Sequence, residues 1–293
     1  MLKRIAIGLG VVLGLIVIAV VALYLVGSSK VDRTYEVQTA SLTVPTDSAS
    51  IARGAHLVNV YGCTDCHGED LSGQVYADGP PFRVTASNLT SGEGGIGATY
   101  TAEDFDRAIR HGVKPDGRSL LIMPSPAFHG ISDHDMAAMI AYLQQAEPVD
   151  AEHPPTEVRL MGRLLAVGPL DPASEVRVEQ PRGTAPEPGP TAAYGAYLAQ
   201  VCAYCHGENM EGMLEPPGPP GMIPAPGLAA SGGWTFEEFE TALRTGVRPN
   251  GTEVNTKFMP IALTRHFSDE EMRALHAYFG TLTGTEVAAS TDA

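Results

Sequence analysis

The feature that most constrains this chain is a short cysteine–histidine motif that occurs twice. All four cysteines belong to it: Cys63 and Cys66 before His67 in "YGCTDCHGEDLSG", and Cys202 and Cys205 before His206 in "VCAYCHGENMEG". Both copies read C-x-x-C-H-G-E, which places two thiols about one helical turn apart with an imidazole directly after them. Any fold of this chain must therefore bring each pair of sulfurs and its histidine to a common site.

The sequence around the motif is duplicated as well. Cys63 to Pro81 aligns with Cys202 to Pro220 without a gap, at an offset of 139 residues. Further on, "YTAEDFDRAIRHGVKPDGR" matches "WTFEEFETALRTGVRPNGT", and "MPSPAFHGISDHDMAAMIAYL" matches "MPIALTRHFSDEEMRALHAYF". The same order of parts twice predicts two copies of one domain, at residues 51–147 and 191–283.

Each copy has the signals of short helices. "TAEDFDRAIRHG" and "TFEEFETALRTG" begin with a threonine N-cap, carry acids in the first turn and end at glycine. "SDHDMAAMIAYL" and "SDEEMRALHAYF" begin on serine and then space apolar residues as a helix does. No stretch alternates convincingly at period two. The fold class predicted is all-α, with two tandem domains.

The chain begins with an apolar stretch. Ile5 to Gly27 contains no charge, and 23 helical residues span roughly 34 Å, enough for a bilayer core. We expect residues 1–27 to be an uncleaved membrane anchor rather than a signal peptide, because no convincing cleavage site follows. Lys3 and Arg4 predict a cytoplasmic N-terminus in the inner membrane, with everything after Gly27 on the periplasmic side.

The remaining segments are expected to connect or to trail. Residues 28–50 are predicted to be a polar tether, residues 148–190 a linker rich in proline and glycine, and residues 284–293 a tail. The apolar piece "VRLMGRLLAVGPL" within the linker is expected to pack on one domain. The net charge of −15 argues against nucleic acid as a partner and suits a basic protein partner.

Three interpretations of C-x-x-C-H compete. A redox disulfide would need a thioredoxin-like βαβ setting, which this pattern lacks. A shared zinc site would need two cysteine pairs spaced far more closely than these. Covalent attachment of a c-type haem fits both copies, because the thiols can reach two vinyl groups and the histidine can turn onto the iron. The sequence therefore predicts two covalently attached haem c groups, with His67 and His206 as proximal iron ligands.

Methionines are the candidates for the opposite face of each iron. Met123 aligns with Met259 in a loop, each followed by proline, and these two are predicted to be axial ligands. Met222, in the proline-rich loop "GPPGMIPAPG", is a rival for the second iron. Met136 and Met272 also align, but they lie on the apolar stripe of a helix and are interpreted as core residues. Ligation by histidine and methionine closes both axial positions and suits one-electron transfer.

These motifs resemble the class I cytochrome c family, and most closely the membrane-anchored multihaem cytochromes that serve as electron-transfer subunits of periplasmic alcohol and gluconate dehydrogenases. The likeness covers about two-thirds of the chain. It implies His67 with Met123, and His206 with Met259, as axial pairs. It also implies that the first and last helices of each domain cross, near Gly54 and Tyr142 and near Gly195 and Tyr278. Alcohol dehydrogenase subunits usually carry three such domains, whereas this chain has two.

Three functional hypotheses follow. The first is a membrane-anchored dihaem relay in a respiratory chain, which accepts electrons from a dehydrogenase or quinol-oxidising complex and passes them to an oxidase or small cytochrome. The second is a dihaem enzyme, either a peroxidase or a thiosulfate-oxidising cytochrome, although such enzymes usually have one differently ligated iron. The third is a mainly structural subunit that docks a respiratory assembly. The first explains the closed axial positions and the anchor best, so the chain is expected to carry electrons rather than to act as a stand-alone enzyme.

Overall fold

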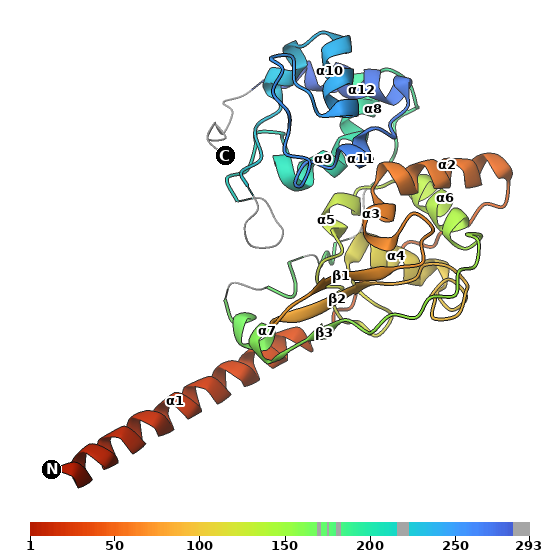
Figure 1. Cartoon of the computed structure of the whole chain (residues 1–293). Coiled ribbons are helices and arrows are strands. Elements are labelled where there is room, and N and C mark those ends of the chain that lie inside the picture. Colours follow the sequence, from red (N-terminus) through yellow and green to blue (C-terminus); the bar gives the residue numbers. More distant parts are fainter. Residues whose placement is uncertain (169–170, 175, 180–182, 216–222, 284–293) are drawn as a thin grey trace.

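The computed structural model describes residues 1–168, 171–174, 176–179, 183–215 and 223–283. A long N-terminal helix projects from a first domain, and a second helical domain is stacked on the first (Figure 1). The described chain is mostly helical, which confirms the predicted fold class. The predicted tail, residues 284–293, lies outside the described residues.

Helix α1 (Leu2–Val31) carries the whole apolar stretch. Its side chains are exposed along its length, and Gly27 is its only buried residue. α1 is long and apolar enough to cross a membrane, a property that an N-terminal signal sequence shares. In water this surface would remain uncovered, so the helix is suited to lipid.

The first domain is built on five helices. They are α2 (Ser48–Val60), α3 (Cys63–His67), α4 (Ala102–His111), α5 (Ser125–Phe128) and α6 (Asp133–Leu143). Thr101 and Ser132 accept hydrogen bonds from backbone N–H groups at the starts of α4 and α6, and Gly112 ends α4 in a left-handed conformation. The predicted caps and stop are therefore confirmed. Met136 lies in the fully buried core, as its place on the apolar stripe predicts.

The second domain repeats this order. Its elements are α8 (Ala192–Leu198), α9 (Gln200–His206), the 3-10 helix η1 (Ala229–Gly233), α10 (Phe236–Thr245), α11 (Ile261–Thr264) and α12 (Asp269–Phe279). Thr235 and Ser268 form capping boxes with Glu238 and Glu271. Met272 is fully buried in the core, in the place that Met136 takes in the first domain.

Glycine allows the first and last helices of each domain to touch. A Cβ on Gly54 would overlap the carbonyl oxygen of Ala138 in α6, one turn before Tyr142. A Cβ on Gly195 would likewise overlap the carbonyl oxygen of Ala274 in α12, and would lie 2.8 Å from Cβ of Tyr278. Both expected crossings are therefore confirmed, and at each one the helix backbones are in direct contact.

We expect Gly195→Ala to destabilise the second domain by about 3 kcal/mol, because a helix backbone cannot move aside as a flexible side chain can. Urea denaturation of the holoprotein, followed by circular dichroism, measures the change. Gly233→Ala is the matched control, since nothing lies within 4 Å of a Cβ there. Equal stability of the two variants would contradict the close crossing.

A small sheet in the first domain was not predicted. Strands β1 (Gln74–Asp78), β2 (Phe82–Ala86) and β3 (Glu157–Val158) pair antiparallel in the order β1-β2-β3. The pairing register shifts between Val75 and Ala77, which is a β-bulge and breaks the alternation of side chains along β1. β3 comes from the segment expected to be a linker, so part of that segment belongs to the first domain's sheet.

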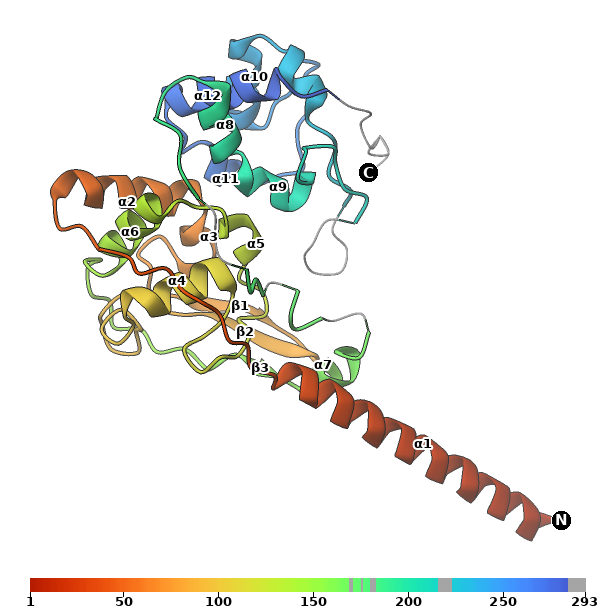
Figure 2. The same ribbon diagram turned by 180° about the vertical axis from the view of Figure 1, so that it is seen from behind.

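Part of the predicted tether, residues 28–50, packs on the first domain. Residues 34–44, here called the strap, run over the domain from the end of α1 towards α2 (Figure 2). The backbone N–H of Ala40 donates to the carboxylate of Asp106 at 2.9 Å, and Leu42 and Val44 pack against the core. The strap is therefore held on the domain by a long-range hydrogen bond and by apolar contacts, which its polar composition alone does not indicate.

Helix α7 (Leu160–Leu165) is the predicted apolar piece of the linker. It packs on the end of α1, where Arg163 pairs with Asp32 at 2.7 Å and its backbone carbonyl meets Gly27. Gly162 meets the carbonyl of Pro81 in the β1–β2 turn. The expectation that this piece packs on a domain is confirmed, and α7 also joins that domain to α1.

Candidate functional site

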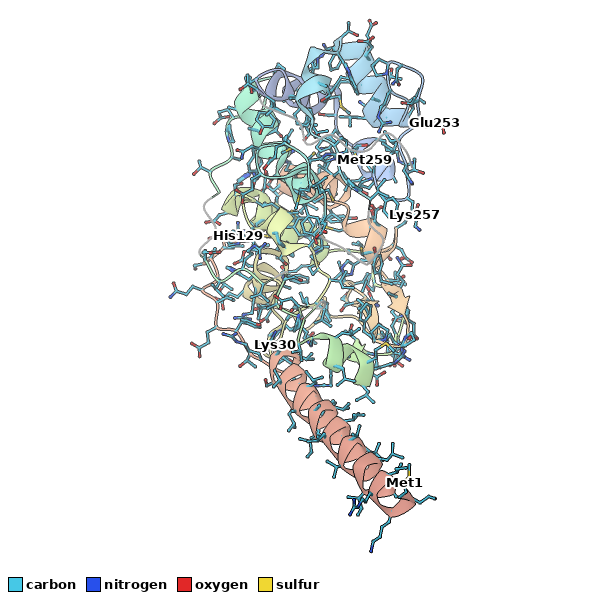
Figure 3. The ribbon with its side chains drawn as sticks, turned by 90° about the vertical axis from the view of Figure 1, so that its left-hand side faces the viewer. Met1, Lys30, His129, Glu253, Lys257 and Met259 are labelled. Atoms are coloured by element: carbon cyan, nitrogen blue, oxygen red, sulfur yellow. The ribbon has the colours of Figure 1, made fainter. Side chains whose placement is uncertain are left out.

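Each domain contains a cavity lined by its own C-x-x-C-H motif and its own loop methionine. In the first domain the cavity measures about 110 Å³ and its wall includes Cys63, Cys66, His67 and Met123. In the second it measures about 220 Å³ and its wall includes Cys202, Cys205, His206 and Met259. In each domain the fold thus brings together the two cysteines, the histidine and the methionine that the sequence predicts as site residues. Met259 of the second domain is labelled in Figure 3.

The cysteines lie on short helices that end at the histidine. α3 begins after Gly62 and stops at Gly68, and α9 stops at Gly207, with both stop glycines at a φ near +84°. None of the four cysteines forms a disulfide. Burial raises the pKa of Cys63 and of Cys202 to about 12, so neither thiol ionises near neutral pH. A redox nucleophile needs a lowered thiol pKa, so these raised values argue against that role for either cysteine.

Both histidines are held in one tautomer by a backbone carbonyl. Nδ1 of His67 donates to the carbonyl of Ser87 at 2.8 Å, and Nδ1 of His206 donates to that of Pro226 at 2.7 Å. A carbonyl oxygen only accepts, so the lone pair of each ring is on Nε2, free to bind a metal. Burial lowers the pKa of both imidazoles against the opposing effect of these hydrogen bonds, so both are neutral.

The loop methionines are braced in the same way in both domains. The N–H of Ser125 donates to the carbonyl of Met123 at 2.7 Å, and the N–H of Ile261 donates to that of Met259 at 2.9 Å. In each loop the next residue is proline, which removes a backbone rotation. A turn this short and stiff can present a thioether at a fixed place on the cavity wall. The rival Met222 lies outside the described residues.

The other histidines do not line either cavity. Most have polar partners elsewhere, either backbone carbonyls or carboxylates: His56, His111, His129, His134, His153 and His276. Among the described residues, no group of three or more histidine, cysteine or acidic side chains forms a metal site of the usual kind. Among the described residues, the candidate iron ligands and attachment points on each cavity wall are therefore one neutral imidazole, one thioether and two thiols.

This donor set fits a c-type haem. Imidazole with thioether is a ligand pair of haem iron in electron carriers, and the paired thiols supply the attachment points. The rest of each wall is largely apolar, which suits a porphyrin face: Tyr76, Val84, Leu89, Phe105 and Ile109 in the first cavity, and Trp234, Phe239, Phe258, Phe267 and Phe279 in the second. The donors and the walls are thus both compatible with the group that the motif predicts.

The residues that orient the histidines were not predicted from the sequence. Ser87 and Pro226 each follow their histidine by the same interval, so the constant offset of the repeat could have indicated them. Their function rests on a backbone carbonyl, however, and neither side chain gives a chemical signal. The β1–β2 hairpin was missed as a cavity wall for the first site, where Tyr76 and Val84 contribute.

A family model described as "Cytochrome c" matches residues 51–147 and 192–283. The chain is 28% identical over 271 residues to the cytochrome c subunit of a quinone alcohol dehydrogenase from Gluconacetobacter polyoxogenes. The matched region covers 82% of this chain and 57% of that protein. It is 36% identical over 131 residues to the fructose dehydrogenase cytochrome subunit of Gluconobacter japonicus, covering 41% of this chain and 27% of that protein.

A third relative is the gluconate 2-dehydrogenase cytochrome c subunit of Pantoea cypripedii, 31% identical over 170 residues, which covers 54% of this chain and 37% of that protein. The chain thus spans about half, or less, of the length of these relatives. All three relatives are cytochrome subunits of dehydrogenases.

Proposed function

The chain belongs to the cytochrome c family, and from this premise we propose that it is a membrane-anchored dihaem relay that takes electrons from a dehydrogenase. The observation that carries the proposal is the pairing of one histidine and one methionine on the wall of a single cavity, found in both domains. Two protein ligands leave an iron no open position for substrate, which favours electron transfer over catalysis.

In this proposal the residues of each domain have separate roles. Cys63 with Cys66, and Cys202 with Cys205, attach the haem, while His67 with Met123, and His206 with Met259, ligate its iron. A haem c in each cavity would supply one iron that gains and loses a single electron. The protein fixes the ligand orientation through the Ser87 and Pro226 carbonyls and surrounds the site with largely apolar walls.

The proposed partners are redox proteins. The relatives are named as cytochrome subunits of alcohol, fructose and gluconate dehydrogenases, which supports a dehydrogenase as electron donor. A small cytochrome or an oxidase is the proposed acceptor, and the net charge of −15 favours a basic docking face on it. α1 is proposed to anchor the chain in the inner membrane, with Lys3 and Arg4 in the cytoplasm and both haem domains in the periplasm.

Near-infrared magnetic circular dichroism of the oxidised protein tests the ligands, because it counts methionine–iron charge transfer per haem. We expect about two equivalents in the wild type and about one in Met259→Leu, together with a lower reduction potential at that site. Met272→Leu, which changes a buried core methionine, should keep both. One equivalent or fewer in the wild type would overturn the relay and favour a dihaem enzyme with an open or differently ligated iron.

A further inference from the structure

The walls of the two cavities meet at the boundary between the domains. Leu263 of α11 lines the second cavity, and its Cδ1 lies 2.6 Å from the position of a Cβ on Gly62. Gly62 directly precedes Cys63, which lines the first cavity. Leu263 is only 8% exposed, so this contact is largely buried. We call α3 and α9, which carry the paired cysteines, the attachment helices. The buried side chain of Leu263 therefore joins the wall of the second cavity to the start of the first attachment helix, α3.

A second contact runs in the opposite direction. Val201 and Tyr204, on either side of Cys202 in α9, pack against the first domain's core, which includes Phe128 of α5. Val60, at the end of α2, packs in the second domain's core. α9 and α11 thus face α2, α3 and α5 across the boundary (Figure 1). Each attachment helix therefore has neighbours from the other domain, α3 at Gly62 and α9 at Val201 and Tyr204.

Two equivalent hydrogen bonds cross the same boundary. Nε2 of His56 in α2 lies 2.7 Å from Glu271 at the start of α12, and the hydroxyl of Tyr197 in α8 donates to Asp135 at the start of α6 at 2.8 Å. His56 and Tyr197 each follow the crossing glycine by two residues, and Asp135 and Glu271 align in the repeat. The two domains therefore pair as a symmetric dimer does, through the same surface used twice.

Arg53 occupies the centre of this arrangement. Its guanidinium binds both oxygens of Asp135 at 3.2 Å, Glu271 across the boundary at 3.1 Å, and the hydroxyl of Tyr194 at 3.1 Å. The side chains of Asp135 and Glu271 are only 4% and 5% exposed. Buried, charge-assisted hydrogen bonds of this kind fix geometry more strongly than exposed pairs.

Glu271 is stabilised as a carboxylate in this position. Burial alone would raise its pKa, but the hydrogen bonds from His56 and from the N–H of Ser268, with the charges of His56 and Arg53, lower it to about 2. It therefore stays ionised at neutral pH. A second negative charge placed beside it would be strongly repelled, which provides a way to open the boundary without touching either cavity.

We propose that His56 and Tyr197, with their carboxylate partners Glu271 and Asp135, are positioning residues that hold the two haem sites in one arrangement for electron transfer within the chain. The inference rests on the proposed function. In this step a single electron would pass from one haem site to the other. The first site would be oxidised and the second reduced, with no transfer of atoms or protons. Tunnelling falls steeply with distance, so holding each attachment helix against the other domain sets the rate.

The test uses the full-length holoprotein and the variant His56→Asp, which sets a carboxylate against Glu271. We expect the amides of residues 60–63 and 200–204 to exchange hydrogen about tenfold faster, because a like charge at a buried pair costs more than 1.4 kcal/mol. One-electron exchange between the sites, followed after pulsed reduction, should slow in the same variant. Tyr197→Phe, which removes the second cross-boundary bond, should change both quantities in the same direction.

Two variants serve as controls. His56→Gln keeps a donor for Glu271 and should restore both measurements. Asn250→Asp adds one negative charge in an exposed turn of the second domain, where the new carboxylate can still accept from the N–H of Thr252, and should leave both unchanged. Wild-type electron-exchange rates in His56→Asp, with both methionine–iron signals intact, would overturn the inference. Fewer than two such signals in the wild type would instead overturn the proposed function.

Discussion

Replacing Cys202 and Cys205 together with serine is expected to lower the covalently bound haem from about two equivalents per chain to about one. The second domain has a cavity of about 220 Å³ walled by apolar residues, and a domain of this size has little other core to compensate. We therefore expect it to unfold at a lower temperature than the first domain, which keeps its own motif.

Pyridine haemochrome spectra of the denatured chain measure the haem, and calorimetry measures the unfolding. The reciprocal change, Cys63 and Cys66 to serine, is the matched variant and should remove the other equivalent. Haem content that stays at the wild-type value in either variant would refute covalent attachment at that motif. This pair of variants also counts the haems independently of their axial ligands.

Asp106→Ala is expected to destabilise the first domain by about 3–5 kcal/mol. Asp106 and Arg110 are both fully buried and bonded at 2.8 Å, and Asp106 also accepts the N–H of Ala40 in the strap. Without the carboxylate, the guanidinium of Arg110 keeps its contacts with Ile131 and Asp133 but loses its buried counter-ion. Urea denaturation measures the loss, and faster hydrogen exchange at Ala40 should accompany it.

The repeat provides the control for this prediction. Glu240 and Arg244 occupy the aligned positions in α10, with a separation of 3.3 Å, but their side chains are 31% and 28% exposed. Water screens a partly exposed pair of this kind, which contributes roughly 0.5 kcal/mol, so Glu240→Ala should have a small effect. Similar losses in the two variants would mean that burial does not determine the strength of the pair.

The parts of the fold that the sequence predicted depend on local signals. The Thr101 and Ser132 caps, the Gly112 stop and the apolar stripe that carries Met136 all act within one or two turns, so each can be read from neighbouring residues. The two candidate sites could be proposed for the same reason. Each attachment motif is contiguous, and the repeat located the second ligand by alignment.

The features that the sequence missed depend on distant contacts or on irregular backbone. The β-bulge between Val75 and Ala77 hides the alternation by which β1 could have been recognised. The strap is held by Asp106, 66 residues beyond Ala40, so nothing near Ala40 indicates that it is bound. Asp135 and Glu271 lie in the first turns of α6 and α12, where an acid favours a helix start, and nothing near them in the sequence indicates that they also join the two domains.

The attachment of α1 has a consequence for how partners meet this protein. The first domain is joined to the end of α1 at two places. One is the ion pair between Arg163 and Asp32, and the other is the strap. With α1 in a membrane, the two domains would therefore keep a fixed height above the bilayer and a fixed tilt to it. Only lateral diffusion and rotation about the membrane normal would remain. Encounters would then be confined to two dimensions, and the depth at which a partner presents its own redox centre would decide whether it can exchange electrons.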